Sequence, residues 1–308
     1  MKTPLLNPVL TGLATRFMLA QPSVGLKIAP ILNTQLHASQ YYIYDTSNFT
    51  DVPLDIQRAP SSPFKRLTSK LSSDSFIAKD YGIEEPLDKL QIKMFSSVFA
   101  ADQSAMERCV SIVLVNHEIR VRNLARAVTQ TSTPAVKWNA SSGTTIVADI
   151  EAAKSVIRAK TGVIPNLLTL SYDAFIALRQ SAELKAYYSY VQGGLLTLDN
   201  LKTILGVEEI VVSGTLINNA NEGQTAALGD IWTKEAFLSY SRPSGDIKGL
   251  NFARTFNWTA LDGSGPSGVS TFTYDENEID SRIVRARQYT DEKVIAASAG
   301  YYFSSVLP

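Results

Sequence analysis

Residues 149–175, with the sequence DIEAAKSVIRAKTGVIPNLLTLSYDAF, contain the pattern that decides the fold. Apolar or small side chains recur in steps of three and four over 149–161, which predicts a helix that is closed by Gly162. The apolar run at 166–170 predicts a buried strand. Ser171 then stands at the N-cap of a second predicted helix. The order helix, strand, helix indicates a packed α/β layer.

The same texture continues toward the C-terminus and then changes to strands. Residues 197–206 predict a short helix that ends at Gly206, and strands are predicted at 207–212 and within 227–240. From residue 252 onward every predicted element is a strand, over residues 255–259, 270–274, 282–289 and 293–303. The fold class is therefore predicted to be α+β.

A long helix is predicted before the α/β layer, over residues 101–129. Its apolar or small residues fall in steps of three and four, at Met106, Val110, Val113, Leu114, Val121, Leu124, Ala125 and Val128. At ~1.5 Å per residue, about 28 residues span roughly 42 Å. Such a length is typical of the backbone of a thin, extended body.

The first 92 residues have a different character. Four prolines, at positions 4, 8, 22 and 30, favour an extended arm over a long helix in the first 35 residues. Two predicted strands, at 41–44 and 75–81, then flank a polar, turn-rich middle. An excursion of this length in a compact domain is usually functional or contacts another molecule.

The composition excludes several functional classes. The 308 residues include 29 Lys plus Arg and 29 Asp plus Glu, so no net charge points to nucleic acid or an acidic substrate. One cysteine, Cys109, allows no intrachain disulfide and no cysteine-rich metal site, and the chain has two histidines, His37 and His117. No stretch is apolar for long enough to span a bilayer. We expect no metal, no cofactor, no membrane contact and no enzymatic activity.

Three short features that could carry chemistry lack the context they need. Residues 263–268 match GxGxxG, but a proline within the motif and the strand predicted at 270–274 deny the helix that binds a dinucleotide. His117-Glu118 lacks the second histidine of a zinc-binding HExxH motif. Cys109 lies on the apolar stripe of the long helix and is predicted to be a core residue.

The order of the parts carries more information than any single motif. It is an extended arm, a two-stranded excursion, a long helix, a compact α/β domain and closing strands. Within the α/β domain, the informative segments besides 149–175 are Leu205-Gly206-Val207, Ile210–Val212, Gly229-Asp230-Ile231-Trp232 and Ala236-Phe237-Leu238. In this order and these segments the chain resembles the major capsid proteins of tailed bacteriophages, which have the Hong Kong-type shell fold.

This resemblance implies an α+β capsid shell fold with five parts. They are an N-terminal arm (1–35), an E-loop that reaches over a neighbouring subunit (36–92), a peripheral domain with the spine helix (93–145), an axial domain (146–285) and returning strands of the peripheral domain (286–308).

The resemblance also implies a function. It predicts a structural major capsid (head) protein that self-assembles into an icosahedral shell enclosing double-stranded DNA. The partners would be copies of the same chain, in pentamers and hexamers, and packaged DNA held by non-specific backbone contacts. The resemblance allows for separate scaffold, portal and decoration proteins. It implies a location in the virion capsid, with assembly in the host cytoplasm.

Three alternatives stay open on the sequence alone. An encapsulin-like compartment shares this fold and would hold a protein cargo instead of a genome. A phage tail or decoration protein would use the all-strand C-terminal third as its main body. An α/β enzyme would carry carboxylate or serine chemistry in a pocket that gathers perturbed acids.

Two groups of side chains are candidates for contacts with partners. In the excursion, an apolar pair beside basic residues favours contact with a neighbouring subunit over an ordinary solvated loop, at Phe64, Lys65, Arg66, Leu67 and Lys70. Near the end of the long helix, Arg120, Arg122 and Arg126 have two interpretations. They complement the helix dipole as a solvated end, or they face packed DNA in the lumen and contact its phosphates.

Overall fold

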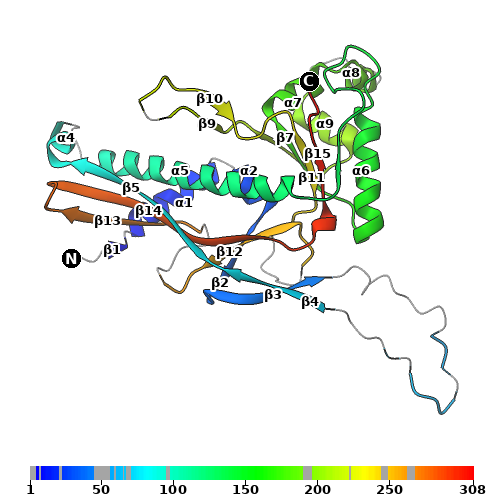
Figure 1. The fold of residues 1–308 in the computed structure, drawn as a ribbon, viewed down its shortest axis with the longest axis horizontal. Coiled ribbons are helices and arrows are strands. Elements are labelled where there is room, and N and C mark those ends of the chain that lie inside the picture. Colours follow the sequence, from blue (N-terminus) through cyan, green and yellow to red (C-terminus); the bar gives the residue numbers. More distant parts are fainter. Residues whose placement is uncertain are drawn as a thin grey trace.

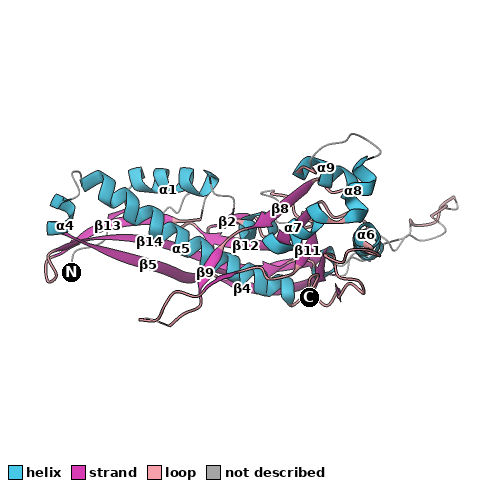
Figure 2. Ribbon diagram, turned by 90° about the horizontal axis from the view of Figure 1, so that it is seen from above, coloured by secondary structure: helices cyan, strands magenta, loops and turns pink. Residues whose placement is uncertain are grey.

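The computed structural model describes residues 5–6, 8–20, 23–44, 56–58, 60–64, 66, 71–94, 98–189, 196–221, 223–243, 249–261 and 268–308. They form an elongated body in which one long helix, α5 (Val98–Arg126), runs along a long β-sheet toward a second, mixed α/β layer at one end (Figures 1 and 2). The predicted spine helix and α+β fold class are therefore confirmed, with the helix displaced by about three residues toward the N-terminus.

The long sheet is organised around one strand, β14 (Ser281–Val294). Its order is β1-β13-β14-β12-β2, and a further strand, β5, pairs with the other edge of β14. The β5 pairing is antiparallel and continuous from Ser281 opposite Asp88 to Thr290 opposite Lys79. The other strands are β1 (Leu5–Leu6), β2 (Ile31–Thr34), β5 (Lys79–Asp88), β12 (Ala253–Trp258) and β13 (Ser270–Glu276).

The α/β layer contains the stretch that opened the sequence analysis. Its five-stranded sheet has the order β6-β15-β11-β7-β8, with bounds Thr131–Ser132, Gly300–Phe303, Ala236–Ser239, Leu167–Ser171 and Glu209–Ser213. Its helices are α6 (Ile146–Thr161), α7 (Tyr172–Gln180), α8 (Ala182–Ser189) and α9 (Leu198–Leu205). The predicted local signals are confirmed, because Gly162 ends α6 with a φ of 73° and the Ser171 hydroxyl accepts from the Ala174 N–H.

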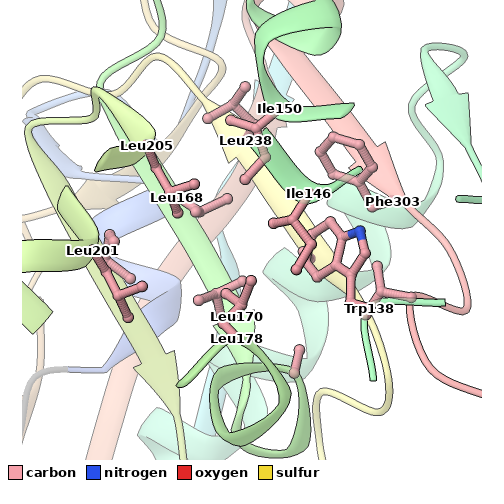
Figure 3. Close-up of a cluster of buried hydrophobic side chains, with 14 of the residues drawn as sticks. Trp138, Ile146, Ile150, Leu168, Leu170, Leu178, Leu201, Leu205, Leu238 and Phe303 are labelled. Carbon is pink, nitrogen blue, oxygen red and sulfur yellow. The ribbon is translucent and has the colours of Figure 1, made fainter. Parts of the chain in front are cut away.

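One apolar cluster holds this layer together (Figure 3). Leu168 and Leu170 from the interior strand β7 share this cluster with helix residues such as Ile150 and Leu201, and all four are fully buried. Trp138 packs against Phe303 with 5.6 Å between ring centroids, and its indole N–H donates to Asp149. Leu167, on the other face of β7, lies in a second apolar cluster with Trp232 and Phe237. Burial on both faces explains why the sequence of β7 is largely apolar.

The spine helix packs one stripe against the long sheet and another against the α/β layer. Along its first half, Met106, Val110 and Val113 share a cluster with Val284 and Ala286 of β14. Cys109 lies in the same cluster and is buried, as predicted, and burial raises the pKa of its thiol to about 11. A short helix, α4 (Lys89–Met94), precedes the spine.

The N-terminal segment is helical where an extended arm was expected. It forms α1 (Pro8–Ala20) and α2 (Val24–Ile28), both of which contact α5. That prediction is wrong for these residues, because the prolines do not interrupt helix interiors. Pro8 is the first residue of α1, where a missing N–H costs little, and Pro30 lies between α2 and β2. Pro4 and Pro22 lie outside the described residues.

The two-stranded excursion is confirmed at its base. Strands β3 (Ala38–Tyr44) and β4 (Leu71–Ile77) pair antiparallel and project from the body (Figure 1). Tyr41 and Phe76 anchor this hairpin in a small apolar cluster, where the Phe76 ring stacks on Phe256 with centroids 4.2 Å apart. Hairpin residues outside this cluster are mostly exposed.

The two sheets exchange strands in a way that the sequence did not reveal. Strands β12 and β13 belong to the long sheet although they fall within 146–285, and β15 belongs to the α/β sheet although it falls within 286–308. The sheet limits therefore differ from these expected ranges. Of the GxGxxG match, residues 263–267 lie outside the described residues, and strand β13 follows Gly268, which has a φ of 74°.

Within the described residues, no helix is long and apolar enough to cross a membrane, and no group of three or more His, Cys, Asp and Glu side chains could hold a metal ion.

Candidate functional site

The spine helix is joined to the two sheets by a set of buried and partly exposed polar side chains, which we call the polar joint. Its members are His117, Glu118, Arg120, Arg122 and Arg126 of α5 together with Glu235 and Glu292. The three carboxylates are at most 8% exposed. Because an unpaired buried carboxylate is strongly unfavourable, each must have a defined set of partners.

Glu292 and Arg120 join the spine to the long sheet. The guanidinium donates to both carboxylate oxygens, with Nε–Oε2 2.8 Å and Nη2–Oε1 2.9 Å, and its carbon lies 3.7 Å from the ring centroid of Tyr81 on β5. Thr290 also donates to Glu292. Burial alone would raise the pKa of the Glu292 carboxyl, but these hydrogen bonds and the nearby positive charge hold it below its ordinary value.

Glu235 joins the C-terminal end of the spine to the α/β layer. It immediately precedes β11 and is 1% exposed. Arg122 Nε donates to its Oε1 at 3.1 Å, and Arg126 donates to both oxygens, with Nε–Oε2 2.8 Å and Nη2–Oε1 3.0 Å. The Tyr302 hydroxyl from β15 donates to the same carboxylate, and burial together with this hydrogen bond raises the pKa of Tyr302 to about 12.

Glu118 makes the third link, and all of its hydrogen-bond donors are neutral. Ser213 Oγ donates at 2.9 Å and Trp232 Nε1 at 3.1 Å, both to Oε1, while Thr215 Oγ1 donates to Oε2 at 3.2 Å. Burial raises the pKa of the Glu118 carboxyl, and the three hydrogen bonds oppose that rise. The donors come from the end of β8, from the residue two beyond it and from the segment before β11, so one side chain ties three parts of the α/β layer to the spine.

His117 links the spine to the long sheet as a neutral imidazole. The Thr255 hydroxyl donates its proton to the Ala29 carbonyl at 2.9 Å, so it must accept from His117 Nε2, which lies 2.9 Å away. Nδ1 has no hydrogen-bond partner among the described residues, and it faces Gly25, where a Cβ atom would lie only 2.9 Å from it. Burial is the main reason why the pKa of His117 falls to about 4.

The polar joint changes the interpretation of the arginine triple. The sequence predicted that Arg120, Arg122 and Arg126 either face DNA in the lumen or form a solvated helix end. All three donate to buried carboxylates of their own chain; the side chains of Arg120 and Arg122 are less than one-fifth exposed, and that of Arg126 is 37% exposed. Pairing within the subunit neutralises the charge that a phosphate contact would use.

Sequence reasoning missed the carboxylates of the polar joint. A usable signal exists for Glu118, because helical spacing from Val110 through Val113 and Leu114 to Val121 places it on the buried stripe with His117. No local signal marks Glu235 or Glu292. Their arginine partners lie more than 100 residues away in the sequence.

The predicted contact residues in the excursion are only partly described. Phe64 is 71% exposed, and the guanidinium carbon of Arg58 lies 4.6 Å from its ring centroid. Arg66 is also exposed. Lys65, Leu67 and Lys70 lie outside the described residues. An aromatic ring this exposed on a projecting segment is the kind of feature that marks a contact surface.

We compared the sequence and the fold with known proteins. No family model matches the chain. The major capsid protein of Burkholderia phage BcepMu is 22% identical over 313 residues, covering 99% of this chain and 98% of that protein. A phage-related protein of Bordetella bronchiseptica RB50 superposes with a TM-score of 0.77 and 19% identity over 100% of both chains.

Two further solved structures are more distant in sequence. The virus-like particle of Pyrococcus furiosus matches with a TM-score of 0.58 and 10% identity, covering 96% of this chain and 98% of that one. The capsid of cyanophage P-SCSP1u matches with a TM-score of 0.57 and 9% identity, covering 91% and 87%. The chain has the phage capsid shell fold.

This fold confirms the predicted resemblance to tailed-phage major capsid proteins. The matches support a structural protein of a capsid shell and point away from an enzyme. The polar joint fits such a role, because its ion pairs and hydrogen bonds join the spine helix to both sheets. Its ion pairs and hydrogen bonds hold elements of the fold in place.

Removing the Glu235 charge should destabilise the subunit strongly. We expect Glu235→Gln to lower the free energy of unfolding by about 3 kcal/mol, because two buried or half-buried guanidinium groups lose their counter-charge. The measurement is urea unfolding of the unassembled chain, followed by tryptophan fluorescence. Glu208→Gln is the matched control, since its ion pair with Arg242 is more than half exposed on both sides and should contribute nothing measurable. Equal losses in the two variants would contradict the assignment.

Neutral, buried His117 should make the subunit sensitive to acid. Because its folded pKa of about 4 lies below the ordinary value of 6.5, the unfolded chain binds the proton first, and stability falls as the pH drops from 6.5 toward 4. We expect this group to remove about 2 kcal/mol of unfolding free energy between pH 7.5 and pH 5. His117→Gln, whose amide can still donate to Thr255, should lack that component. An unchanged pH profile in the variant would refute the explanation.

Proposed function

We propose that this chain is a major capsid protein that self-assembles through pentamers and hexamers into an icosahedral shell around double-stranded DNA. The observation that carries the proposal is the full-length similarity to a phage major capsid protein, together with the capsid fold. The physical design supports it. The body is fixed by the polar joint, while hairpin β3–β4 projects with little apolar anchoring of its own.

In this proposal the parts of the chain have separate tasks. Residues 1–35 are the N-terminal arm, 36–92 the E-loop, 93–145 the peripheral domain with the spine, 146–285 the axial domain and 286–308 the returning strands. The exchange of strands between the two sheets couples the peripheral and axial domains within one folding unit.

Contacts between subunits are assigned to the end of the E-loop. Phe64 and Arg66 are exposed there, and Lys65, Leu67 and Lys70 are their neighbours in sequence. Burial of an aromatic ring contributes roughly 2 kcal/mol, and the basic residues would select an acidic surface on the next copy. A shell repeats such a contact at every subunit, so modest individual energies suffice.

The DNA contact is proposed to be non-specific and weak. The chain has no net charge, and the guanidinium groups of Arg120, Arg122 and Arg126 are engaged by carboxylates within the subunit. Confinement by the closed shell, rather than a basic lining built on this triple, would then retain the genome. The proposal includes a location in the virion, assembly in the host cytoplasm, separate scaffold, portal and decoration proteins, and no catalytic activity.

A second candidate is an encapsulin-like compartment with a protein cargo. The fold matches a virus-like particle about as well as a cyanophage capsid, so it does not separate the two functions. The contents of the shell separate them.

Electron microscopy of the purified chain, alongside light-scattering mass, should show closed shells or pentamers and hexamers. Shells recovered from host cells are treated with nuclease, opened and assayed for double-stranded DNA and for copurifying protein. Protected DNA supports the phage head, and a stoichiometric protein cargo supports the compartment. A chain that stays monomeric at high concentration, with and without host extract as a source of scaffold, would refute both.

Phe64→Glu should block assembly without unfolding the subunit. The ring is exposed, so the circular dichroism spectrum and the melting temperature should not change. The yield of particles should fall sharply because a charge replaces an apolar contact. Phe64→Tyr keeps the ring and should assemble normally. Normal assembly of Phe64→Glu would remove this residue from the interface.

A further inference from the structure

A second hairpin projects from the body and has no role in what precedes. Strands β9 (Leu216–Asn218) and β10 (Leu228–Asp230) pair antiparallel and leave the α/β layer on the side of α5 opposite to hairpin β3–β4 (Figure 1). The connection between them, where described, is mostly exposed. A two-stranded ribbon is marginally stable by itself, so a projecting one is stabilised by whatever it contacts.

The composition of this hairpin is unusual for an exposed segment. Residues 214–230, with the sequence GTLINNANEGQTAALGD, contain no Lys or Arg and two acids, Glu222 and Asp230, whereas 19% of the whole chain is charged. Charged side chains are what normally keep an exposed ribbon soluble and unpaired. A surface with so few of them, and no basic one, suits burial against another protein surface and offers nothing to a phosphate backbone.

The apolar side chains gather on the outer face of the ribbon. Leu216 lies opposite Asp230 and Leu228 opposite Asn218, so the two leucines are diagonal neighbours on one face. They are 52% and 68% exposed. Ile217, on the other face, packs against the apolar cluster that contains Trp232 and the spine. The inner face of the hairpin thus packs on its own subunit, and the outer face presents two exposed leucines.

Hydrogen bonds fix the shape of the hairpin before any partner binds. The Asn218 side-chain oxygen accepts from the N–H groups of Ala220 at 3.0 Å and Ala227 at 2.9 Å. The Asn219 N–H donates to the Ala227 carbonyl at 2.9 Å, and the Gln224 N–H to the Asn221 carbonyl at 3.1 Å. A preorganised projection loses little entropy when it docks.

We propose that the outer face of hairpin β9–β10, centred on Leu216 and Leu228, docks on the body of a second copy of this chain. Charge favours this occupant, because the face carries two leucines, Asn218 and one acid, Asp230, and no basic residue. Such a face disfavours nucleic acid and fits a protein surface that is not acidic. Geometry favours it as well. Two hairpins that project from opposite sides of the spine suit head-to-tail contacts, which close into rings. The proposal rests on the proposed shell function and adds a second contact to it.

The test places the photo-crosslinking amino acid p-benzoylphenylalanine at position 228 of the full chain. Irradiation of assembled particles should give covalent dimers, and mass spectrometry should find residue 228 joined to a peptide that belongs to the other chain. The same amino acid at position 217, on the inner face, is the control and should crosslink within its own chain. Unassembled subunits carrying position 228 should give no dimers.

A paired substitution measures the energetic contribution. Leu228→Glu should weaken association at least about tenfold, since it places a charge where the proposed contact buries a leucine. The circular dichroism spectrum and the melting temperature should not change, because Leu228 is exposed in the subunit. Leu228→Ile keeps the apolar surface and should assemble as the natural chain does. Normal assembly of Leu228→Glu, together with assembled particles that give no covalent dimers from the crosslinker at position 228, would overturn this inference and leave the proposed function intact. Failure of the unsubstituted chain to assemble would overturn both.

Discussion

The structure depends on the burial of three carboxylates against one helix. Glu118, Glu235 and Glu292 each need specific donors, and the donors are supplied from α5 and from both sheets. Apolar packing alone would keep the spine helix against the two sheets, but such packing tolerates small sliding and rotation of the helix. A carboxylate that loses its partner in the interior is penalised at once. The polar joint therefore fixes the position of the long sheet relative to the α/β layer, at some cost in stability.

The two projecting hairpins are only weakly anchored to the body. Hairpin β3–β4 is held at its base by a few side chains, among them Tyr41 and Phe76, and hairpin β9–β10 packs through Ile217. Neither ribbon buries enough apolar surface to be stable alone. Their directions are set by the body, and their stabilisation is left to a partner. Folding of the chain thus stabilises the body, and in the proposed shell the contacts with neighbouring subunits stabilise the two hairpins.

Short sequence patterns predicted local helices and strands well, but they could not predict ion pairs between residues far apart in the sequence. The helix–strand–helix unit at 149–175 was predictable because its cap, its left-handed glycine and its apolar run all lie within the segment. The N-terminal prolines misled, because their effect depends on whether each falls inside a helix or at its first residue. The ion pairs of Arg120, Arg122 and Arg126 were not predictable because Glu235 and Glu292 lie 109 to 172 residues away from them, and nothing in the helix itself marks them.

Neutrality and weak, repeated contacts belong together in a chain that closes a shell. Many identical subunits with a large net charge would repel one another as they packed edge to edge. A chain with balanced charges avoids this, and each proposed contact can then be small: an exposed ring between β3 and β4 and two exposed leucines in hairpin β9–β10. Weak contacts let a misplaced subunit dissociate, while the many contacts in a closed particle act together and hold it. Closure of the proposed shell thus combines a body fixed by buried ion pairs with projecting hairpins that make small individual contacts.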